Sequence, residues 1–263
     1  MPFIGKKYLL SSECAERIYG KIEGLPIVDP HNHAIVSEIA SNGNYGNPWQ
    51  FFIGTDHYIW SLLRKFSVEE RYITGTASPE EKWNRLAGVF PHMAGNPVYE
   101  WMHLELRRFM GIEELLGPST GRMIWEKTCR LLKEPGYRPQ ALLGRLGVEV
   151  MCSSDDPVDL LDDHDKVNSA MGRILVHPTW RADRIVSVSA PWWPGYVRQL
   201  SERFGADASS LQGLLDNLQK SHDYFALHGC LASDHSMRIP FHCVSERKQA
   251  DRIFTRVYSG QTA

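Results

Sequence analysis

Two histidines separated by one residue, His31 and His33, are the side chains whose type and spacing most directly indicate chemistry. They follow the apolar run 25–30, which is typical of a short buried strand. Residues two apart on a strand point to the same face, so both imidazoles can reach one metal ion at the usual zinc–nitrogen distance of about 2.0–2.1 Å. Because the sequence has 11 His, a chance pair of hydrogen-bonded histidines remains the alternative to a metal site.

Arg181 and Tyr58 can each act on a substrate, although each also has an ordinary structural explanation. The guanidinium of Arg181 matches a carboxylate with two parallel hydrogen bonds, and the preceding Trp180 can shield such a pair from water. The alternative is an ion pair with nearby Asp183. Tyr58 can move protons if a neighbouring cation lowers the pKa of its phenol. The alternative is a core or surface tyrosine in the first turn of a helix.

Two acidic clusters also follow apolar runs. Asp155 and Asp156 precede Pro157, an arrangement that favours a helix cap over a paired-carboxylate site. Asp234 and His235 either belong to a site or lie at the cap of another helix. We therefore interpret the first cluster as structural and keep both alternatives for the second.

All of these polar clusters come at the ends of predicted strands. The strands are expected at four apolar runs, 25–30, 148–152, 173–176 and 230–232. Strands that alternate with helices predict a parallel α/β sheet or barrel. In such folds the carboxyl ends of the strands meet at one rim, so the clusters are expected to converge there.

Helical patterns dominate the middle of the chain. We predict helices at 55–66, 79–89, 96–109, 119–132 and 139–146. Asn96 before Pro97, and Ser78 before Pro79, are start signals, and Gly111 is a stop signal. The chain then divides into an N-terminal helix with the first strand at 1–48, a helical insertion at 49–146, and further strand–helix units at 147–263.

The composition is typical of a globular protein and shows no pattern of a nucleic-acid-binding, membrane-binding or membrane-spanning protein. Hydrophobic residues make up 43% of 263 residues, which is enough for a proper core. The formal net charge of -2 argues against nucleic-acid and membrane-surface partners. Five Cys without a paired spacing indicate reduced thiols, and no signal-peptide pattern or long apolar run is visible, so we expect a cytoplasmic location.

Read together, the motifs resemble those of uronate (glucuronate) isomerases, members of the amidohydrolase superfamily. The resemblance extends from about residue 7 to residue 235, in the order found in the family. The matching stretches are LPIVDPHNH, GTDHYIW, ITGTASPEEKW, GNPVYEWMHLELRRF, PSTGRMIWE, SSDDPVD, HPTWRADR and HGCLASDH.

The resemblance implies a distorted TIM-type (β/α)8 barrel with a helical insertion after the first strand. It implies reversible aldose–ketose isomerisation of D-glucuronate to D-fructuronate and of D-galacturonate to D-tagaturonate. It also implies that His31 and His33 bind a divalent metal, with zinc expected, and that Arg181 binds the substrate, through its carboxylate. Tyr58 and Asp234 become the active-site phenol and carboxylate.

The sequence departs from the family pattern in two ways. The family usually has HCH where this chain has His31-Asn32-His33, a change that we expect to be tolerated because Asn32 points to the opposite face of a strand. The larger departure is length, because no residue after Asp234 matches the later strands that supply another His, a Trp, an Asp and an Arg. We therefore expect a partial barrel of about four strands.

This partial match leaves two other functions open. One is a metal-dependent hydrolase on the same scaffold, which the His pair alone permits. The other is a catalytically incomplete fragment or subunit that binds uronates or a complementing chain. An uncovered sheet edge would favour self-association, so a homo-oligomer or a complementing chain is the expected partner besides uronate sugars.

Overall fold

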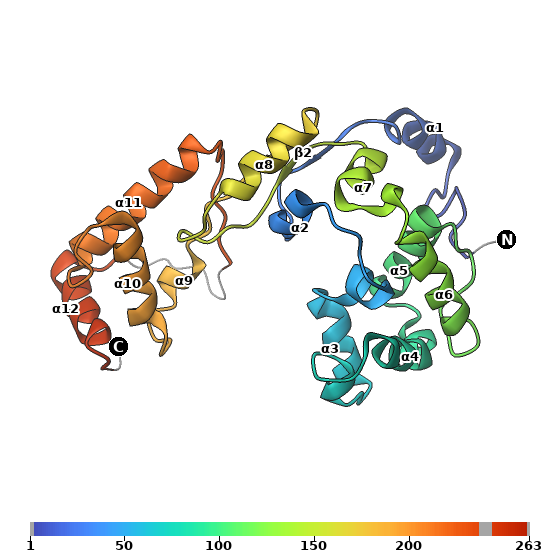
Figure 1. Cartoon of the computed structure of the whole chain (residues 1–263), viewed down its shortest axis with the longest axis horizontal. Coiled ribbons are helices and arrows are strands. Elements are labelled where there is room, and N and C mark those ends of the chain that lie inside the picture. The colour runs from blue at the N-terminus through green and yellow to red at the C-terminus, as the bar shows by residue number, and fades with distance from the viewer. Residues whose placement is uncertain (1–2, 237–243, 262–263) are drawn as a thin grey trace. The chain divides into compact units, whose positions relative to one another are not determined.

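The computed structural model describes residues 3–236 and 244–261, and its chain forms two compact units (Figure 1). The first, which we call the helical unit, combines the chain up to Leu25 with Asn42–Arg145. The second, the sheet unit, combines Pro26–Ser41 with the chain from Leu146 onward. The expected boundaries at 48/49 and 146/147 place the N-terminal helix with the first strand, whereas in the structure that helix groups with the helical unit.

The helical unit contains the five predicted helices, each within two residues of its expected ends. It also contains an N-terminal helix. The α-helices of this unit are α1 (Glu13–Ile22), α3 (His57–Lys65), α4 (Pro79–Val89), α5 (Pro97–Met110), α6 (Gly121–Leu131) and α7 (Pro139–Leu146). Short turns of other helical types lie between them, at Trp49–Ile53, Glu70–Tyr72, Phe90–Met93 and Pro135–Tyr137.

The predicted start and stop signals of two helices are confirmed. At α4, the Ser78 hydroxyl accepts from the Glu81 N–H, and the Glu81 carboxylate accepts from the Ser78 N–H. At α5, the Asn96 side chain accepts from the Val98 N–H, and Gly111 ends the helix in the left-handed conformation at φ 59°. Local sequence therefore sets where these helices begin and end.

The sheet unit contains three parallel strands in the order β1-β2-β3. They are β1 (Ile27–Asp29), β2 (Val148–Cys152) and β3 (Leu175–His177), and the pairing aligns Val28 with Val150 and Met151 with Val176. The helices of this unit are α2 (Val36–Ser41), α8 (Asp162–Met171), α9 (Asp183–Val186), α10 (Trp193–Phe204), α11 (Leu211–Leu227) and α12 (Arg247–Tyr258). The fold is α/β, and no closed barrel forms within residues 3–236 and 244–261.

Two expectations about the strands are wrong. The run 230–232 is not a strand. The Cys230 N–H donates to Phe225 O at the end of α11, so it cannot also pair with a neighbouring strand. A single parallel bridge between Trp180 and Ser233 replaces the expected strand. The first strand is exposed rather than buried, with Val28 63% exposed.

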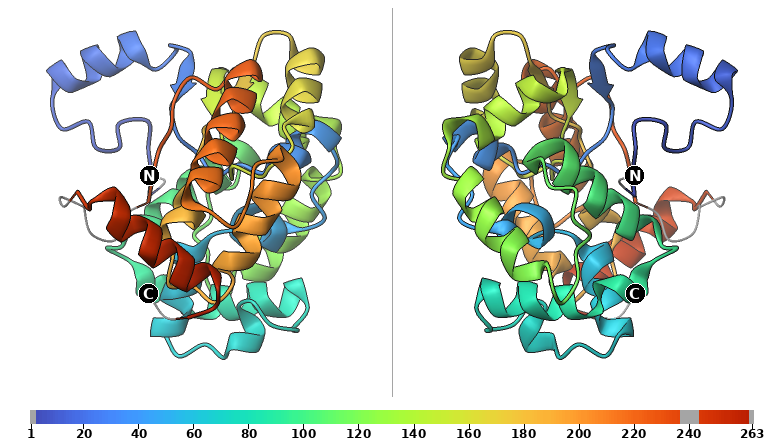
Figure 2. Two further views of the ribbon diagram at one scale, coloured as in Figure 1. Left: turned by 90° about the vertical axis from the view of Figure 1, so that its left-hand side faces the viewer. Right: turned by 90° about the vertical axis from the view of Figure 1, so that its right-hand side faces the viewer.

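The core of the sheet unit's C-terminal part lies among three helices. Figures 1 and 2 show α10, α11 and α12 together. Trp193 and Val197 of α10 pack with Leu214 of α11 and with Phe254 and Val257 of α12. No helix in the described part of the chain is both long enough and apolar enough to span a membrane.

One acidic side chain of the helical unit is partly buried. Glu105 lies on α5, and its burial raises its pKa to about 7. The negative charge of Asp56 adds to this effect. The Asp56 carboxylate itself accepts hydrogen bonds from the Tyr58 and Ile59 N–H groups and thereby caps α3.

We expect Glu105 to make the chain less stable as the pH rises. The folded chain retains the Glu105 proton up to about pH 7, whereas an unfolded chain releases it near 4.5, so the free energy of unfolding falls between these values and is level above them. The loss is on the order of 3 kcal/mol. Glu105→Gln should remove this fall in the free energy of unfolding, which urea unfolding at pH 5 and pH 8 measures. Glu126→Gln, at an exposed ion pair on α6, is the control, and equal pH dependence in both variants contradicts the prediction.

Candidate functional site

The turn after β1 holds His31 and His33 together. The Asp29 carboxylate accepts from the His31 N–H at 3.2 Å and from Asn32 Nδ2 at 3.3 Å, and Asn32 N–H donates to Cys152 O at 3.0 Å. The two imidazoles then meet edge to face, with their Nε2 atoms 3.2 Å apart. Because β1 ends at Asp29, these contacts, rather than the alternation of a strand, set the shared direction of the two rings.

The segment after the Ser233 bridge brings a carboxylate to the histidines. His31 Nδ1 pairs with Asp234 Oδ2, and Arg181 Nε lies 3.5 Å from Asp234 Oδ1. Arg181 Nε also donates to Asp183 Oδ2 at 2.8 Å, so the ion pair considered from the sequence is present. The structure thus joins His33, His31, Asp234 and Arg181 in one connected set at the carboxyl ends of β1 and β3.

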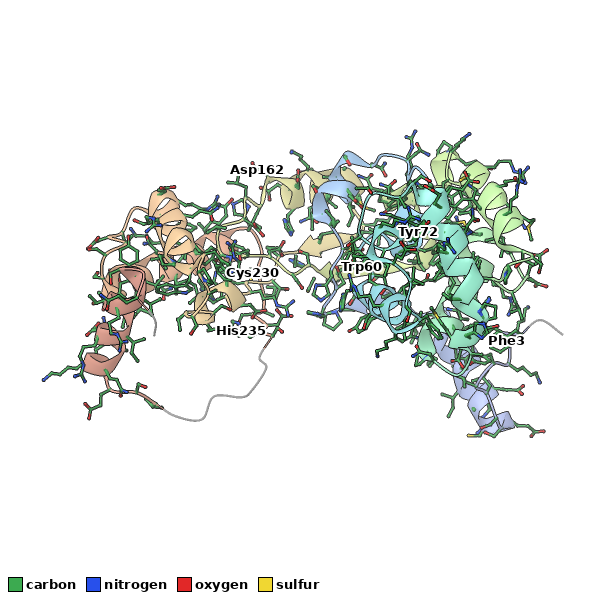
Figure 3. All side chains as sticks on the ribbon, turned by 90° about the horizontal axis from the view of Figure 1, so that it is seen from below. Phe3, Trp60, Tyr72, Asp162, Cys230 and His235 are labelled. Carbon is green, nitrogen blue, oxygen red and sulfur yellow. The ribbon has the colours of Figure 1, made fainter. Side chains whose placement is uncertain are left out.

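Asp183 is a member of this set that sequence reasoning treated only as a structural partner. Besides Arg181, its carboxylate accepts from the Ser236 N–H at 2.9 Å and lies 3.6 Å from His235 Nδ1. His235, labelled in Figure 3, also stands edge-on to the Trp180 ring at a centroid distance of 6.4 Å. The signal that was available is the position of Asp183, two residues after an arginine at a predicted strand end.

A buried hydrogen-bond network links the residues that follow β2 and β3, next to the residues of the candidate site. Asp155 Oδ2 accepts from the Ser153 hydroxyl at 2.7 Å and from the Thr179 N–H at 3.1 Å, and Asp155 Oδ1 lies 3.5 Å from His164 Nε2. Ser153 Oγ also lies 2.8 Å from His164 Nε2. These contacts join the ends of β2 and β3 to α8, an arrangement that differs from the helix cap expected for Asp155.

The prediction that Asp155 and Asp156 cap a helix beginning near Pro157 is wrong. Asp156 accepts from the Val158 N–H at 3.1 Å, but the segment that follows is a turn, and α8 begins only at Asp162. Asp156 also accepts from the Tyr196 hydroxyl at 2.6 Å. Burial, and after it this hydrogen bond, raises the pKa of Tyr196. The phenol of Tyr196 is therefore a fixed donor at neutral pH.

Tyr58 belongs to the helical unit, in the first turn of α3. Its side chain is 61% exposed, and its ring lies 4.3 Å from the His57 ring between centroids. Its backbone N–H is one of the two that donate to the Asp56 carboxylate. Tyr58 is therefore a surface tyrosine of its own unit, with its phenol open to solvent.

The distance between the two histidine nitrogens is compatible with two ligands of one ion. Two nitrogens of a tetrahedral zinc site are about 3.3 Å apart, close to the 3.2 Å between His31 Nε2 and His33 Nε2. The pairing of His31 Nδ1 with Asp234 leaves its Nε2 lone pair available, as in carboxylate–histidine–zinc arrangements. An imidazole–imidazole hydrogen bond explains the same distance, and no group of three or more His, Cys, Asp or Glu suited to a metal occurs within the described part of the chain.

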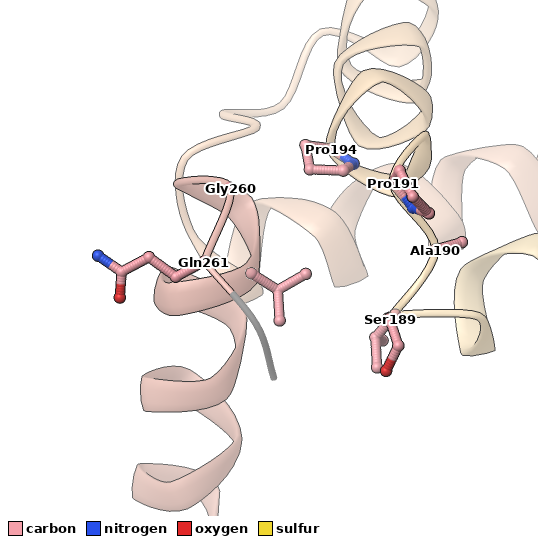
Figure 4. A pocket seen from close by; sticks show the side chains of 8 residues that line it. Ser189, Ala190, Pro191, Pro194, Gly260 and Gln261 are labelled. Atoms are coloured by element: carbon pink, nitrogen blue, oxygen red, sulfur yellow. The ribbon is translucent and has the colours of Figure 1, made fainter.

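The pocket drawn in Figure 4 belongs to another part of the sheet unit. Its volume is about 530 Å³, and it lies between the segment before α10 and the end of α12. Its described lining residues are Val188, Ser189, Ala190, Pro191, Pro194, Val257, Gly260 and Gln261. Since none of these side chains is ionisable, this pocket offers no acid–base group, and the rim remains the candidate site.

Comparison with known proteins identifies the family. A model of the glucuronate isomerase family matches residues 1–263. The chain belongs to the glucuronate isomerase family. Curated relatives named uronate isomerase include those of Thermotoga maritima, 42% identical over 259 residues, and Shouchella clausii, 36% identical over 263 residues.

Solved structures agree with this assignment. The crystal structure of uronate isomerase from Thermotoga maritima matches with a TM-score of 0.93 at 42% identity, covering 98% of this chain and 57% of that chain. Glucuronate isomerase from Caulobacter crescentus shares the fold at a TM-score of 0.86 and 22% identity, covering 93% of this chain and 52% of that chain. The curated relatives from Thermotoga maritima and Shouchella clausii are covered to 57% and 56% of their length, so this glucuronate isomerase family member spans little more than half of them.

We expect Asp155→Ala to destabilise the chain by about 2–4 kcal/mol, because it leaves the buried Thr179 N–H and its neighbours without an acceptor. Asp251→Ala removes an exposed ion pair with Arg247 on α12 and should change stability by less than about 0.5 kcal/mol. Urea unfolding followed by circular dichroism measures both. Equal losses in the two variants contradict the supporting role of Asp155.

Proposed function

We propose that this chain carries part of the active site of a uronate isomerase. The reaction interconverts D-glucuronate with D-fructuronate, and D-galacturonate with D-tagaturonate, by moving a proton between C1 and C2. One observation carries the proposal: in a chain of the glucuronate isomerase family, His31, Asp234 and Arg181 form one connected set. Because the chain spans 57% of its Thermotoga maritima relative, the complete activity is proposed for the complete protein.

We further propose that the three strands belong to a (β/α)8 barrel of the amidohydrolase superfamily. Their parallel order, the crossover through the helical unit between β1 and β2, and the bridge to Ser233 support it. β1 pairs with β2 alone among the described strands, so its other edge is open to a further strand. The exposed side chains of Ile27 and Val28 support further elements that cover the faces of the sheet. Such strands belong either to the same polypeptide or to a complementing chain.

Within the proposed site, Arg181 anchors the sugar carboxylate. Asp234 and Asp183 both approach the guanidinium at Nε, and within the described residues the terminal nitrogens make no hydrogen bond, which leaves them for a bidentate pair with the C6 carboxylate. At 20% side-chain exposure, Arg181 is shielded enough to strengthen that pair and open enough to reach a ligand.

His31 and His33 would hold a divalent metal, with zinc as the proposed ion. When bound, the metal supplies a Lewis acid that polarises the sugar carbonyl. Asp234 holds the His31 ring through Nδ1, and its buried Oδ1 makes no hydrogen bond within the described residues. An acceptor without a hydrogen-bond partner among the described residues supports a part for Asp234 in the proton transfer, and the groups that cover Oδ1 must move before a substrate hydroxyl can reach it. The same part for Tyr58 rests on the family resemblance.

The function is tested by following D-glucuronate in D₂O by NMR with the chain alone, and with the chain plus the remaining part of the Thermotoga maritima relative. Formation of D-fructuronate with solvent deuterium at the transferred position supports the proposal. Ester and lactone hydrolysis are assayed in parallel. Hydrolysis without isomerisation in both preparations contradicts the proposal and favours a metal-dependent hydrolase.

We expect Arg181→Ala to weaken D-glucuronate binding about 10- to 100-fold, the usual range for a lost charge-assisted pair. D-glucuronamide, which lacks the charge, should bind the variant and the wild type equally well. Arg247→Ala, which removes an exposed arginine on α12, is the control. NMR titration measures the affinities, and unchanged D-glucuronate affinity in Arg181→Ala removes the anchoring role.

We expect the chain to bind zinc weakly, because catalytic zinc sites normally have three protein ligands and only two imidazoles converge here. Metal content after dialysis should lie well below one zinc per chain. A His31→Ala/His33→Ala double variant should lose the remainder. Retention of about one zinc would show that another residue, such as His177, Asp234 or His235, completes the site.

A further inference from the structure

Asp183 joins two segments of the proposed site through one carboxylate. Its Oδ2 accepts from Arg181 Nε at 2.8 Å, and its Oδ1 accepts from the Ser236 N–H at 2.9 Å. His235 Nδ1 lies 3.6 Å from the same Oδ1. Each carboxylate oxygen therefore holds a different segment, one following β3 and one following the Ser233 bridge.

This contact constrains how Arg181 presents its charge. A guanidinium is planar and rigid, so fixing Nε fixes the direction of the two terminal nitrogens. The bond from Nε to Asp183 is short, and the Asp183 side chain is only 28% exposed. Asp183 thus orders the long Arg181 side chain before a ligand arrives, which reduces the entropy lost on binding.

The position of Asp234 shows what Asp183 prevents. Asp234 Oδ1 lies 3.5 Å from the same Arg181 Nε and is buried without a hydrogen bond among the described residues. Without the charge of Asp183, Asp234 would be the nearest anion for Arg181. A shift of under 1 Å would then turn their contact into a direct hydrogen bond. That bond would turn Arg181 away from a ligand. The Asp234 carboxylate would then bind both Arg181 and His31.

We propose that Asp183 is a positioning residue for uronate recognition, which keeps Arg181 apart from Asp234 and directs its terminal nitrogens to the sugar carboxylate. The proposal rests on the proposed function for its ligand and on the observed contacts for its mechanism. Asp183 acts through Arg181 and the Ser236 backbone and does not itself contact the substrate.

The positioning is tested without a ligand. In the wild-type chain, NMR should show the Arg181 Nε–H exchanging with solvent at least about tenfold more slowly than that of Arg247, whose side chain is half exposed. Asp183→Asn should abolish the difference and also speed exchange of the Ser236 N–H. Asp183→Glu, which keeps the charge, should retain at least part of the protection. Asp251→Asn should leave Arg181 unchanged. Equal exchange of Arg181 and Arg247 in the wild type overturns the proposal even if a variant fails to fold.

The role in recognition is tested by titration with D-glucuronate. Asp183→Asn should weaken its binding about tenfold or more and leave D-glucuronamide binding unchanged, whereas a general loss of structure would weaken both. Asp183→Glu should restore D-glucuronate affinity to within about threefold. Unchanged D-glucuronate affinity in Asp183→Asn overturns the proposal. If wild-type Arg181 does not respond to D-glucuronate, the proposed function fails, while the exchange experiment still decides whether Asp183 positions Arg181.

Discussion

The buried carboxylate of Asp155 is the interaction on which the site depends. It is 8% exposed, and its partners come from three places: Ser153 after β2, Thr179 after β3, and His164 on α8. A buried charge is stable only when its hydrogen bonds are complete, so these elements have little freedom to move apart. The backbone of Asp155 pairs in turn with Trp180, which places the next residue, Arg181, at the rim.

The helices could be predicted because their information is local. Ser78 with Glu81, and Asn96 with Pro97, determine helix starts from a few neighbouring residues. The strands depend on distant partners, and there prediction was less successful. The run 230–232 has a strand-like composition, but the end of α11 takes up its first N–H, and no pattern within that run reveals the competing acceptor.

The residues that meet beside the strand ends could be singled out from the sequence by type and position, but their contacts with one another could not. His31 and His33 converge because Asp29 and Asn32 hold the turn, a geometry that a strand pattern does not contain. Asp183 was visible as a partner of Arg181, whereas its bond to the Ser236 N–H joins residues 53 apart in the sequence. Such long-range contacts follow from the fold and have no local signature.

The charges at the rim explain why this set suits the proposed ligands together. Asp183 and Asp234 carry two negative charges around the one positive charge of Arg181, so these three side chains have a net charge of about −1. Negative charge beside His31 favours a cation at the imidazole pair. A divalent ion there would reverse the local charge to about +1, which a uronate carboxylate at Arg181 then balances. The metal and the acidic sugar would therefore each favour binding of the other, and the carboxylates that hold Arg181 and His31 couple the two.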